Sequence, residues 1–372
     1  MTGPEAPLTR VLNGPVRRIA VVRALHIGDL LLAVPGLRAL RRAFPNAEIT
    51  LVGLPWARVL VDRLPYLDRL AEFPGYPGML EVDEDPARTA AFLREARAYG
   101  YDLAVQMHGN GRASNAFTLE LGARATVGYY PPSEEDSRLT LGFPYPDHLP
   151  EPLRHVRLMQ LLGLPVDDAR LELPLLPEDA EEVRRVPGLE PFLARRPVVG
   201  LHVGARPPAR RWPVERFAAL GETLARRHDA SLVLLGGPGE ERLVRDVERR
   251  LRDRARVMAL PGTLSLGGLA ALIARLDLFV GNDSGPAHMA VALDTPSVTV
   301  FGPADRRRWA PLDRQRHRVA YREVACSPCP HWECPIDHRC LRWVTVEQVL
   351  QLVEDLLASP AASRPSPSQR GC

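Results

Sequence analysis

Two acidic residues in this sequence stand where an apolar run gives way to helical apolar spacing, and a carboxylate at such a junction can do chemistry. Asp29 lies in "VVRALHIGDLLLAVPGLRAL" and Asp283 lies in "LFVGNDSGPAHMAVALD". An acidic residue between a strand and a helix is an N-cap, or it is a base that takes a proton from a bound ligand. Both interpretations are open for Asp29 from the residues alone.

The segment around Asp283 has the features of an anion-binding site. Asp283 or Ser284 can cap the helix, and Pro286 is tolerated near its start. Free amides and the positive end of the helix dipole then face the space beyond the strand, where a diphosphate fits. His288 lies near the first turn and could reach the same ligand. The alternative is a well-capped turn in which His288 only packs.

A second segment, "GLHVGARPPARRWPVERFAAL", carries three arginines after a strand that Gly204 closes. The guanidinium groups of Arg206, Arg210 and Arg211 can bind phosphate oxygens in bidentate fashion. These arginines fall on the same edge of the same expected sheet as Asp283. That position favours phosphate binding over a solvated basic loop.

The stretch "LLGGPGEERL" is a glycine-rich turn from a strand to a helix. Gly236 permits close approach of a backbone, and Glu240 or Glu241 could accept hydrogen bonds from ribose hydroxyls. A glycine turn with acidic residues in the first turn of a helix explains the stretch equally well.

The stretch "MHGNGRASN" is a polar, glycine-rich turn after another apolar run. Its side chains His108, Asn110 and Arg112 are of the kinds that hold ligands rich in hydroxyl groups. An ordinary polar loop is the alternative.

Four cysteines occur in the spacing C-x2-C-x4-C-x5-C, at Cys326, Cys329, Cys334 and Cys340. Four thiolates in a compact loop have the ligand count of a structural zinc site, although the spacing is not a standard finger pattern. Reduced or loosely paired thiols are the alternative, and we expect no metal at the functional site.

All of these residues except the cysteines follow or open segments that alternate between strand and helix patterns. Such alternation favours parallel βαβ units and an α/β fold with two doubly wound sheets. The expected strands span 18–25, 48–54, 101–108, 125–130, 197–203, 230–237, 255–260, 276–282 and 296–302. The expected helices span 29–44, 87–100, 113–123, 213–228, 239–253, 265–276, 286–294 and 345–358.

The length of 372 residues predicts two domains. We expect an N-terminal Rossmann-like domain over 1–175 and a C-terminal one over 198–345. A segment rich in proline and charge, 176–197, is expected to link them. A final helix over 346–358 and a disordered low-complexity tail over 359–372 complete the expected organisation.

The composition excludes several classes of protein. Apolar residues at 45% and charged residues at 25% are typical of a soluble globular protein. The net charge is only +3, and acidic and basic residues are interspersed, so the sequence lacks the basic clusters typical of nucleic-acid-binding proteins. We find neither an apolar run near 18 residues nor a signal peptide, and therefore expect a cytoplasmic location. Every basic residue other than histidine is arginine, so no lysine can form a Schiff base.

Three segments together resemble glycosyltransferase family 9, the heptosyltransferases of lipopolysaccharide core assembly and their relatives. They are "IGDLLLAVPGLRALRRAFPNAEITLVG", "GLHVGARPPARRWPVERFAAL" and "FVGNDSGPAHMAVALDTPSVTVFGPADRRRWAP". The resemblance covers most of residues 18 to 358. It implies a GT-B fold, in which two Rossmann-like domains face each other across a cleft, with the acceptor on the N-terminal domain and the nucleotide-sugar on the C-terminal one.

The resemblance also implies an inverting transferase that needs no metal or other cofactor. Asp29, in the "GD" pair with Gly28, matches the proposed general base, and Arg210 matches the basic residue that contacts the donor phosphate. Glu240 falls where an acidic residue meets the ribose. The donor-binding loop is matched by Asp283, Ser284, Gly285 and His288. We add Gly204, Arg206, Arg211 and Gly236 as donor contacts, and Gly28, His108 and Asn110 as further substrate contacts.

One departure concerns the acceptor, because Gln106 in "VQMHGNG" replaces an acidic residue often found in relatives. The leading hypothesis is transfer of a sugar to a glycan or glycolipid acceptor, with peripheral contact at the cytoplasmic face of the inner membrane. The leading candidate for the sugar is heptose from an ADP-activated donor. A nucleotide-sugar epimerase and a non-catalytic sugar-nucleotide-binding protein are the alternatives. The donor sugar, its base, the acceptor and the oligomeric state are left open by the sequence.

Overall fold

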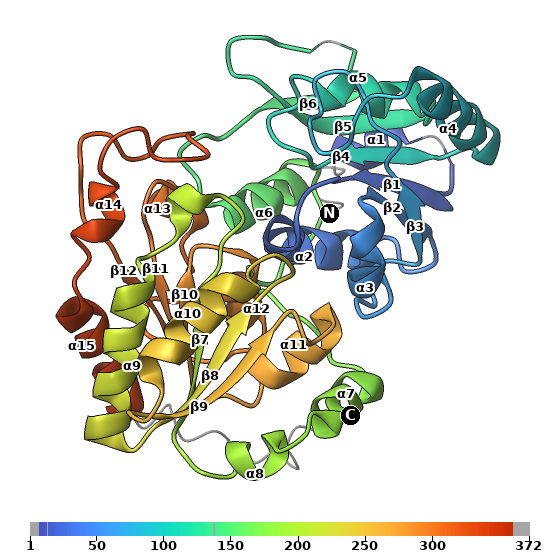
Figure 1. The fold of residues 1–372 in the computed structure, drawn as a ribbon. Helices are drawn as coiled ribbons and strands as arrows, with labels where there is room; N and C mark the ends of the chain where they lie inside the picture. Colours follow the sequence, from blue (N-terminus) through green and yellow to red (C-terminus); the bar gives the residue numbers. More distant parts are fainter. Residues whose placement is uncertain (1–6, 13, 137, 360–372) are drawn as a thin grey trace. The chain divides into compact units, whose positions relative to one another are not determined.

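The computed structural model describes residues 7–12, 14–136 and 138–359. The chain divides into two units, residues 1–171 and 172–372 (Figure 1). The segment 176–197, expected as a linker, forms two helices that belong to the second unit. The tail expected over 359–372 lies, from residue 360 onward, outside the described residues.

The first unit is built on a parallel sheet with the strand order β3-β2-β1-β4-β5-β6. Its strands are β1 (Arg18–Val22), β2 (Glu48–Gly53), β3 (Arg69–Glu72), β4 (Leu103–Gln106), β5 (Ala125–Tyr130) and β6 (Leu141–Pro144). Its helices are α1 (Pro7–Val11), α2 (Ile27–Ala43), η1 (Pro55–Ala57), α3 (Arg58–Val61), α4 (Pro86–Tyr99), α5 (Ser114–Glu120) and α6 (Glu151–Leu161).

The second unit repeats this plan, with the strand order β12-β11-β10-β7-β8-β9 and parallel pairing throughout. Its strands are β7 (Val198–His202), β8 (Ser231–Gly236), β9 (Arg256–Pro261), β10 (Leu278–Asn282), β11 (Ser297–Val300) and β12 (His317–Ala320). Its helices are α7 (Pro177–Arg185), α8 (Leu189–Leu193), η2 (Pro208–Arg210), α9 (Val214–His228), α10 (Glu241–Leu251), α11 (Leu266–Ile273), α12 (Gly285–Ala292), α13 (Arg306–Trp309), α14 (Arg339–Arg342) and α15 (Val346–Ala358).

The central strands are buried and mostly apolar because helices cover both faces of each sheet (Figure 1). In the second unit, α9, α10 and α15 pack against one face, where Trp212 and Phe217 join the core. In the first unit, Phe73 and Phe117 meet edge to face, with ring centroids 5.1 Å apart, on the face that α4 and α5 cover.

Each sheet changes direction next to its first strand. From β1 the chain moves outward through β2 and β3 and returns to β4 on the other side of β1, and β7 and β10 have the same relation. Ligands of doubly wound sheets bind at this switch point, outside the carboxyl ends of the strands. The loops after β1 and β4, and those after β7 and β10, therefore lie where such a site forms.

The structure adds short strands that the sequence analysis missed. They are β3, β6 and β12, with the sequences RLAE, LGFP and HRVA. Each has four residues at or beside the edge of its sheet and carries charge, glycine or proline, so it lacks the continuous apolar run of a central strand. None of the helices within the described residues is long and apolar enough to span a bilayer.

Candidate active site

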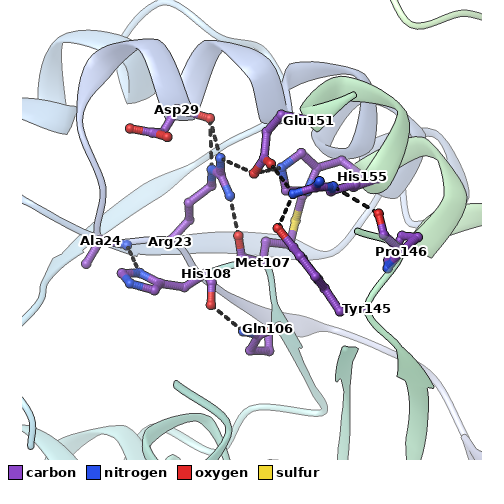
Figure 2. A network of polar contacts seen from close by, with 11 residues as sticks. Arg23, Ala24, Asp29, Gln106, Met107, His108, Tyr145, Pro146, Glu151 and His155 are labelled. Atoms are coloured by element: carbon purple, nitrogen blue, oxygen red, sulfur yellow. Dashed lines mark hydrogen bonds and ion pairs between the residues drawn. The ribbon is translucent and has the colours of Figure 1, made fainter. Parts of the chain in front are cut away.

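Asp29 lies in the first turn of α2, just beyond the end of β1. The N-cap residue of this helix is His26, whose side chain makes no capping hydrogen bond, so Asp29 is not the N-cap. An acidic side chain in the first turn is still favourable for the helix dipole. Within the described residues, its carboxylate makes no hydrogen bond or ion pair, and Figure 2 shows it turned away from the polar network beneath it.

A buried arginine that the sequence analysis did not single out lies under this turn. Arg23 follows β1 and donates from Nε and Nη2 to the backbone oxygen of Asp29, at 2.9 and 2.6 Å. It also donates to the backbone oxygen of Met107, after β4, and to Glu151 in α6 at 3.4 Å (Figure 2). One guanidinium thus ties together the chain after β1, the chain after β4 and α6.

His108 joins the same region from the loop after β4. Its Nδ1 accepts a hydrogen bond from the amide of Ala24 at 3.3 Å. Burial, with a further contribution from the charge of Arg23, lowers the pKa of His108 to about 4, so the ring is neutral at physiological pH. Gln106 holds the loop by donating to the backbone oxygen of His108 at 2.5 Å. His108 therefore packs between two loops at the switch point.

Asn110 lies further along this loop and accepts the amide of Arg112 at 3.2 Å, as in an Asx turn. Arg112 pairs with Glu134 at 2.8 Å. The polar turn expected after β4 is therefore ordered by its own side chains, next to the turn that carries Asp29.

The two segments expected to bind the donor meet at the switch point of the second unit. Arg210, from the loop after β7, donates from Nη1 to Oδ2 of Asp283, after β10, at 3.1 Å. The carboxylate of Asp283 is almost wholly buried, whereas a third of the Arg210 side chain is exposed. Burial raises the pKa of Asp283, and the neighbouring Arg210 opposes that shift. Asp283 therefore orients a guanidinium whose outer face is accessible.

The N-terminus of α12 adjoins this pair. Ser284 is at the N-cap position with extended backbone and donates from its hydroxyl to the backbone oxygen of Asn282 at 3.2 Å, not to the helix. The helix starts at Gly285, one residue before the expected start at Pro286, which lies in its first turn. His288 is buried in the same first turn. The amides of this turn supply partial positive charge beside Arg210.

Asn282 is a second functional candidate that the sequence analysis passed over. Its amide nitrogen donates to the backbone oxygens of Val203 and Gly204, at 3.0 Å each, and its oxygen accepts the amide of Trp212 at 2.8 Å. Asn282 is fully buried, and all three bonds reach the loop after β7. A buried amide must find such partners, which is the signal that an asparagine at the end of an apolar strand offered.

Glu240 lies at the mouth of the third loop of this edge, after β8. Its Oε2 accepts the amide of Gly237 at 2.8 Å and lies 3.8 Å from Nε2 of His202. Burial lowers the pKa of His202, against the effect of the Glu240 charge. A Cβ atom at Gly204 would overlap the Glu240 carboxylate, so a larger residue there would displace that side chain. At Gly236, a Cβ would lie 2.7 Å from Val244.

The remaining arginines of the loop after β7 take different positions. Arg211 turns back and donates to the backbone oxygen of Ala205 at 2.8 Å. Arg206 lies over the ring of Trp332, 5.9 Å from its centroid. Arg210, in contrast, pairs with Asp283 in the loop after β10.

The four cysteines after β12, three in the loop and Cys340 in α14, are free thiols. Burial, followed by the charges of the neighbouring cysteines, raises the pKa of Cys340 to about 11. Across the part of the chain that the structure describes, no group of three or more histidine, cysteine or acidic side chains is arranged to hold a metal ion. The segment contacts the loop after β7, since the backbone oxygen of Trp332 accepts the amide of Ala209 at 3.1 Å.

The chain is similar in sequence to known heptosyltransferases. The chain is 29% identical over 163 residues to lipooligosaccharide heptosyltransferase 2 of Campylobacter jejuni, a match over 43% of this chain and 51% of that protein. It thus spans about half the length of this relative. To lipopolysaccharide heptosyltransferase 2 of Salmonella typhimurium it is 25% identical, over 92% of this chain and 99% of the relative.

Two solved structures share the fold. A glycosyl transferase family 9 protein of Veillonella parvula matches with a TM-score of 0.74 and 23% identity, over 93% of this chain and 98% of its own. The ADP-heptose lipopolysaccharide heptosyltransferase II of E. coli matches with a TM-score of 0.71 and 22% identity, over 91% and 98%. The expected α/β fold of the GT-B class, with two Rossmann-like units, is confirmed.

The model of glycosyltransferase family 9 (heptosyltransferase) matches residues 89–339, about two thirds of the chain, from α4 in the first unit to the end of the cysteine loop. This range includes the Arg210 loop, Glu240 and the Asp283 loop. With the same fold and relatives along its length, the chain belongs to glycosyltransferase family 9.

Proposed function

We propose that this protein transfers heptose from ADP-heptose to a hydroxyl of a lipopolysaccharide core acceptor, with inversion at the anomeric carbon and without a metal. The observation that carries the proposal is the Arg210 guanidinium, held by buried Asp283 at the N-terminus of α12. A nucleoside diphosphate leaving group needs fixed positive potential of this kind. The names of the relatives supply the sugar, the nucleotide and the acceptor.

In the proposed reaction, Asp29 accepts the proton of the acceptor hydroxyl while its oxygen attacks the anomeric carbon of the donor. The bond from that carbon to the diphosphate oxygen breaks, and ADP leaves with its electron pair. A carboxylate without a hydrogen-bonding partner suits the role of base, because amide or guanidinium partners would weaken it. Arg210 and the first turn of α12 receive the charge that develops on the diphosphate.

Glu240 accepts the ribose hydroxyls in this proposal, through the oxygen that Gly237 does not occupy. Gly204 and Gly236 let the nucleotide approach the strand ends, and His108 and Asn110 shape the acceptor side near Asp29. In this proposal the reaction takes place at the cytoplasmic face of the inner membrane, which holds the lipid-linked acceptor and with which the enzyme associates peripherally.

The experiment that tests the proposal starts from the donor. Purified protein is heated with ADP, UDP and GDP and their sugars, because a ligand that binds only the folded state raises the melting temperature. We expect stabilisation by ADP and ADP-heptose, and none by the uridine or guanosine compounds. Incubation with ADP-heptose and heptose-deficient lipopolysaccharide should then release ADP and add one heptose, detected by mass spectrometry.

Two outcomes would overturn the proposal. Conversion of a nucleotide-sugar without an acceptor would identify an epimerase. Binding of ADP-heptose without any transfer to heptose-deficient acceptors would indicate a non-catalytic binding protein.

A further inference from the structure

The Arg23 guanidinium is a buried charge with four hydrogen bonds, and the reaction proposed above does not use it. Its side chain is fully buried, and its partner Glu151 is 3% exposed. Burying a guanidinium costs several kcal/mol unless its donors are paired. Arg23 meets that cost with three acceptors from three separate segments: the backbone oxygens of Asp29 and Met107, and the Glu151 carboxylate.

The direction of these bonds is the informative feature. Two donors of Arg23 converge on the backbone oxygen of Asp29, while the carboxylate of the same residue is turned the other way (Figure 2). A guanidinium that paired with the carboxylate would hold it and weaken it as a base. By binding the backbone oxygen, Arg23 fixes the position of the Asp29 main chain and leaves its carboxylate unpaired.

A purely structural cation would not need this arrangement, and the neighbouring cation shows the contrast. Arg154 is also buried and shares Glu151, at 3.1 Å. Its other donors reach the backbone oxygens of Pro146 and Asp147, at 3.1 and 2.8 Å, and the hydroxyl of Tyr145. None of these bonds reaches the turn that carries Asp29. The two arginines therefore have similar burial and one shared partner but different targets.

We propose that Arg23 is a positioning residue for the transfer reaction, which fixes the Asp29 turn through its backbone oxygen so that the free carboxylate meets the acceptor hydroxyl. This inference rests on the proposed function, since it gives Arg23 a role through Asp29. The fork of the guanidinium is essential, because it spans acceptors in three segments that one ammonium group does not reach together. A displacement of about 1 Å at a reacting group can cost on the order of 10²-fold in rate.

The test compares Arg23→Lys with the matched control Arg154→Lys, which keeps the charge in the same buried cluster. We expect Arg23→Lys to lower kcat about 10²-fold and to leave the KM for ADP-heptose within about twofold. That KM is unaffected because the expected donor contacts lie in the second unit. We expect Arg154→Lys to keep kcat within about threefold. Arg23→Gln serves as a second variant if the lysine variant does not fold.

The Asp29→Asn background separates positioning from general damage. If Arg23 acts through Asp29, then Arg23→Lys lowers the residual kcat of Asp29→Asn less than threefold, because the two effects are not additive. An equal loss of kcat in Arg23→Lys and Arg154→Lys would overturn the proposal. So would an equal fold-loss of kcat from Arg23→Lys in the wild-type and Asp29→Asn backgrounds.

A readout without turnover keeps this test separate from the proposed function. The amide of Leu30 donates to the backbone oxygen of His26 at 3.0 Å in the first turn of α2. Its hydrogen exchange should accelerate in Arg23→Lys and stay unchanged in Arg154→Lys. Unchanged exchange in both variants would refute the proposal that Arg23 fixes the turn that carries Asp29. Absence of transfer by the wild-type protein would refute the proposed function alone.

Discussion

Replacement of Gly204 by alanine is the substitution whose effect the structure defines most sharply. The added Cβ would overlap the carboxylate of Glu240. The φ angle of Gly204 is not in the positive region, so the backbone itself accepts alanine. The perturbation therefore acts through one contact, by forcing Glu240 out of its place.

The magnitude follows from what Glu240 loses. Its Oε2 accepts the amide of Gly237 at 2.8 Å, and a hydrogen bond to a charged group contributes about 2 kcal/mol. For a unit of this size, 2 kcal/mol corresponds to about 4–8 °C in melting temperature. If Glu240 binds the ribose, the same displacement weakens ADP binding about 10-fold, or about 1.4 kcal/mol.

The assay combines thermal unfolding with calorimetric titration of ADP, and two further variants complete it. Gly237→Ala is the matched control, because a Cβ there would lie 3.6 Å from Glu240, an ordinary contact distance. In the Glu240→Ala background the overlap is absent, so Gly204→Ala should cost little further stability. A loss of stability that persists in that background, or normal ADP affinity in Gly204→Ala, would refute the reasoning.

Three further predictions concern other parts of the two units. Arg210→Ala should weaken ADP binding at least 10-fold, measured by calorimetry, and equal affinity would move the phosphate contact to another arginine. Asn282→Asp places a carboxylate against two backbone oxygens in a fully buried position, so we expect a loss of about 3 kcal/mol in unfolding by urea; unchanged stability would contradict the assigned bonds. Burial lowers the pKa of His155 to about 4, so its unfolded form binds more protons below pH 6.5 and stability falls between pH 6.5 and 4. The free energy of unfolding of His155→Phe, relative to that of the wild type, should therefore be about 2 kcal/mol higher at pH 5 than at pH 7.5. The same relative stability at both pH values would contradict this prediction.

Much of the fold follows from local pattern. The central strands β1, β4, β7, β8 and β10 are buried on both faces and show as continuous apolar runs between helical segments. The edge strand β6, with the sequence LGFP, has no such run and owes its pairing to the neighbouring strand β5. Strands of this kind are set by tertiary contacts, which a single sequence does not display.

The candidate site divides in the same way. The Asp283 turn and the Arg210 loop could be predicted to meet, because both follow parallel strands at one sheet edge, and the ion pair between them agrees. Arg23 could not be found, since in a chain whose only long cations are arginines nothing local distinguishes a buried one. Its partners Met107 and Glu151 are distant in sequence, and only folding brings them to it.

The interpretation of Asp29 as a simple N-cap could not be decided from residue types. The structure excludes this interpretation, because His26 is the N-cap residue and the Asp29 carboxylate points away from the polar network (Figure 2). The Asp29 carboxylate does not cap its helix and makes no hydrogen bond or ion pair within the described residues, which leaves it available for the proposed role of base.

The most direct test of this account is the transfer rate of Asp29→Asn with ADP-heptose and a heptose-deficient lipopolysaccharide acceptor. Asparagine has nearly the same shape but accepts no proton, so we expect kcat to fall by about 10²–10⁴-fold, the range of general base catalysis. The Kd of ADP-heptose should stay within about twofold, because Asp29 lies in the first unit. Transfer at the wild-type rate by Asp29→Asn would contradict the central claim that this carboxylate is the base.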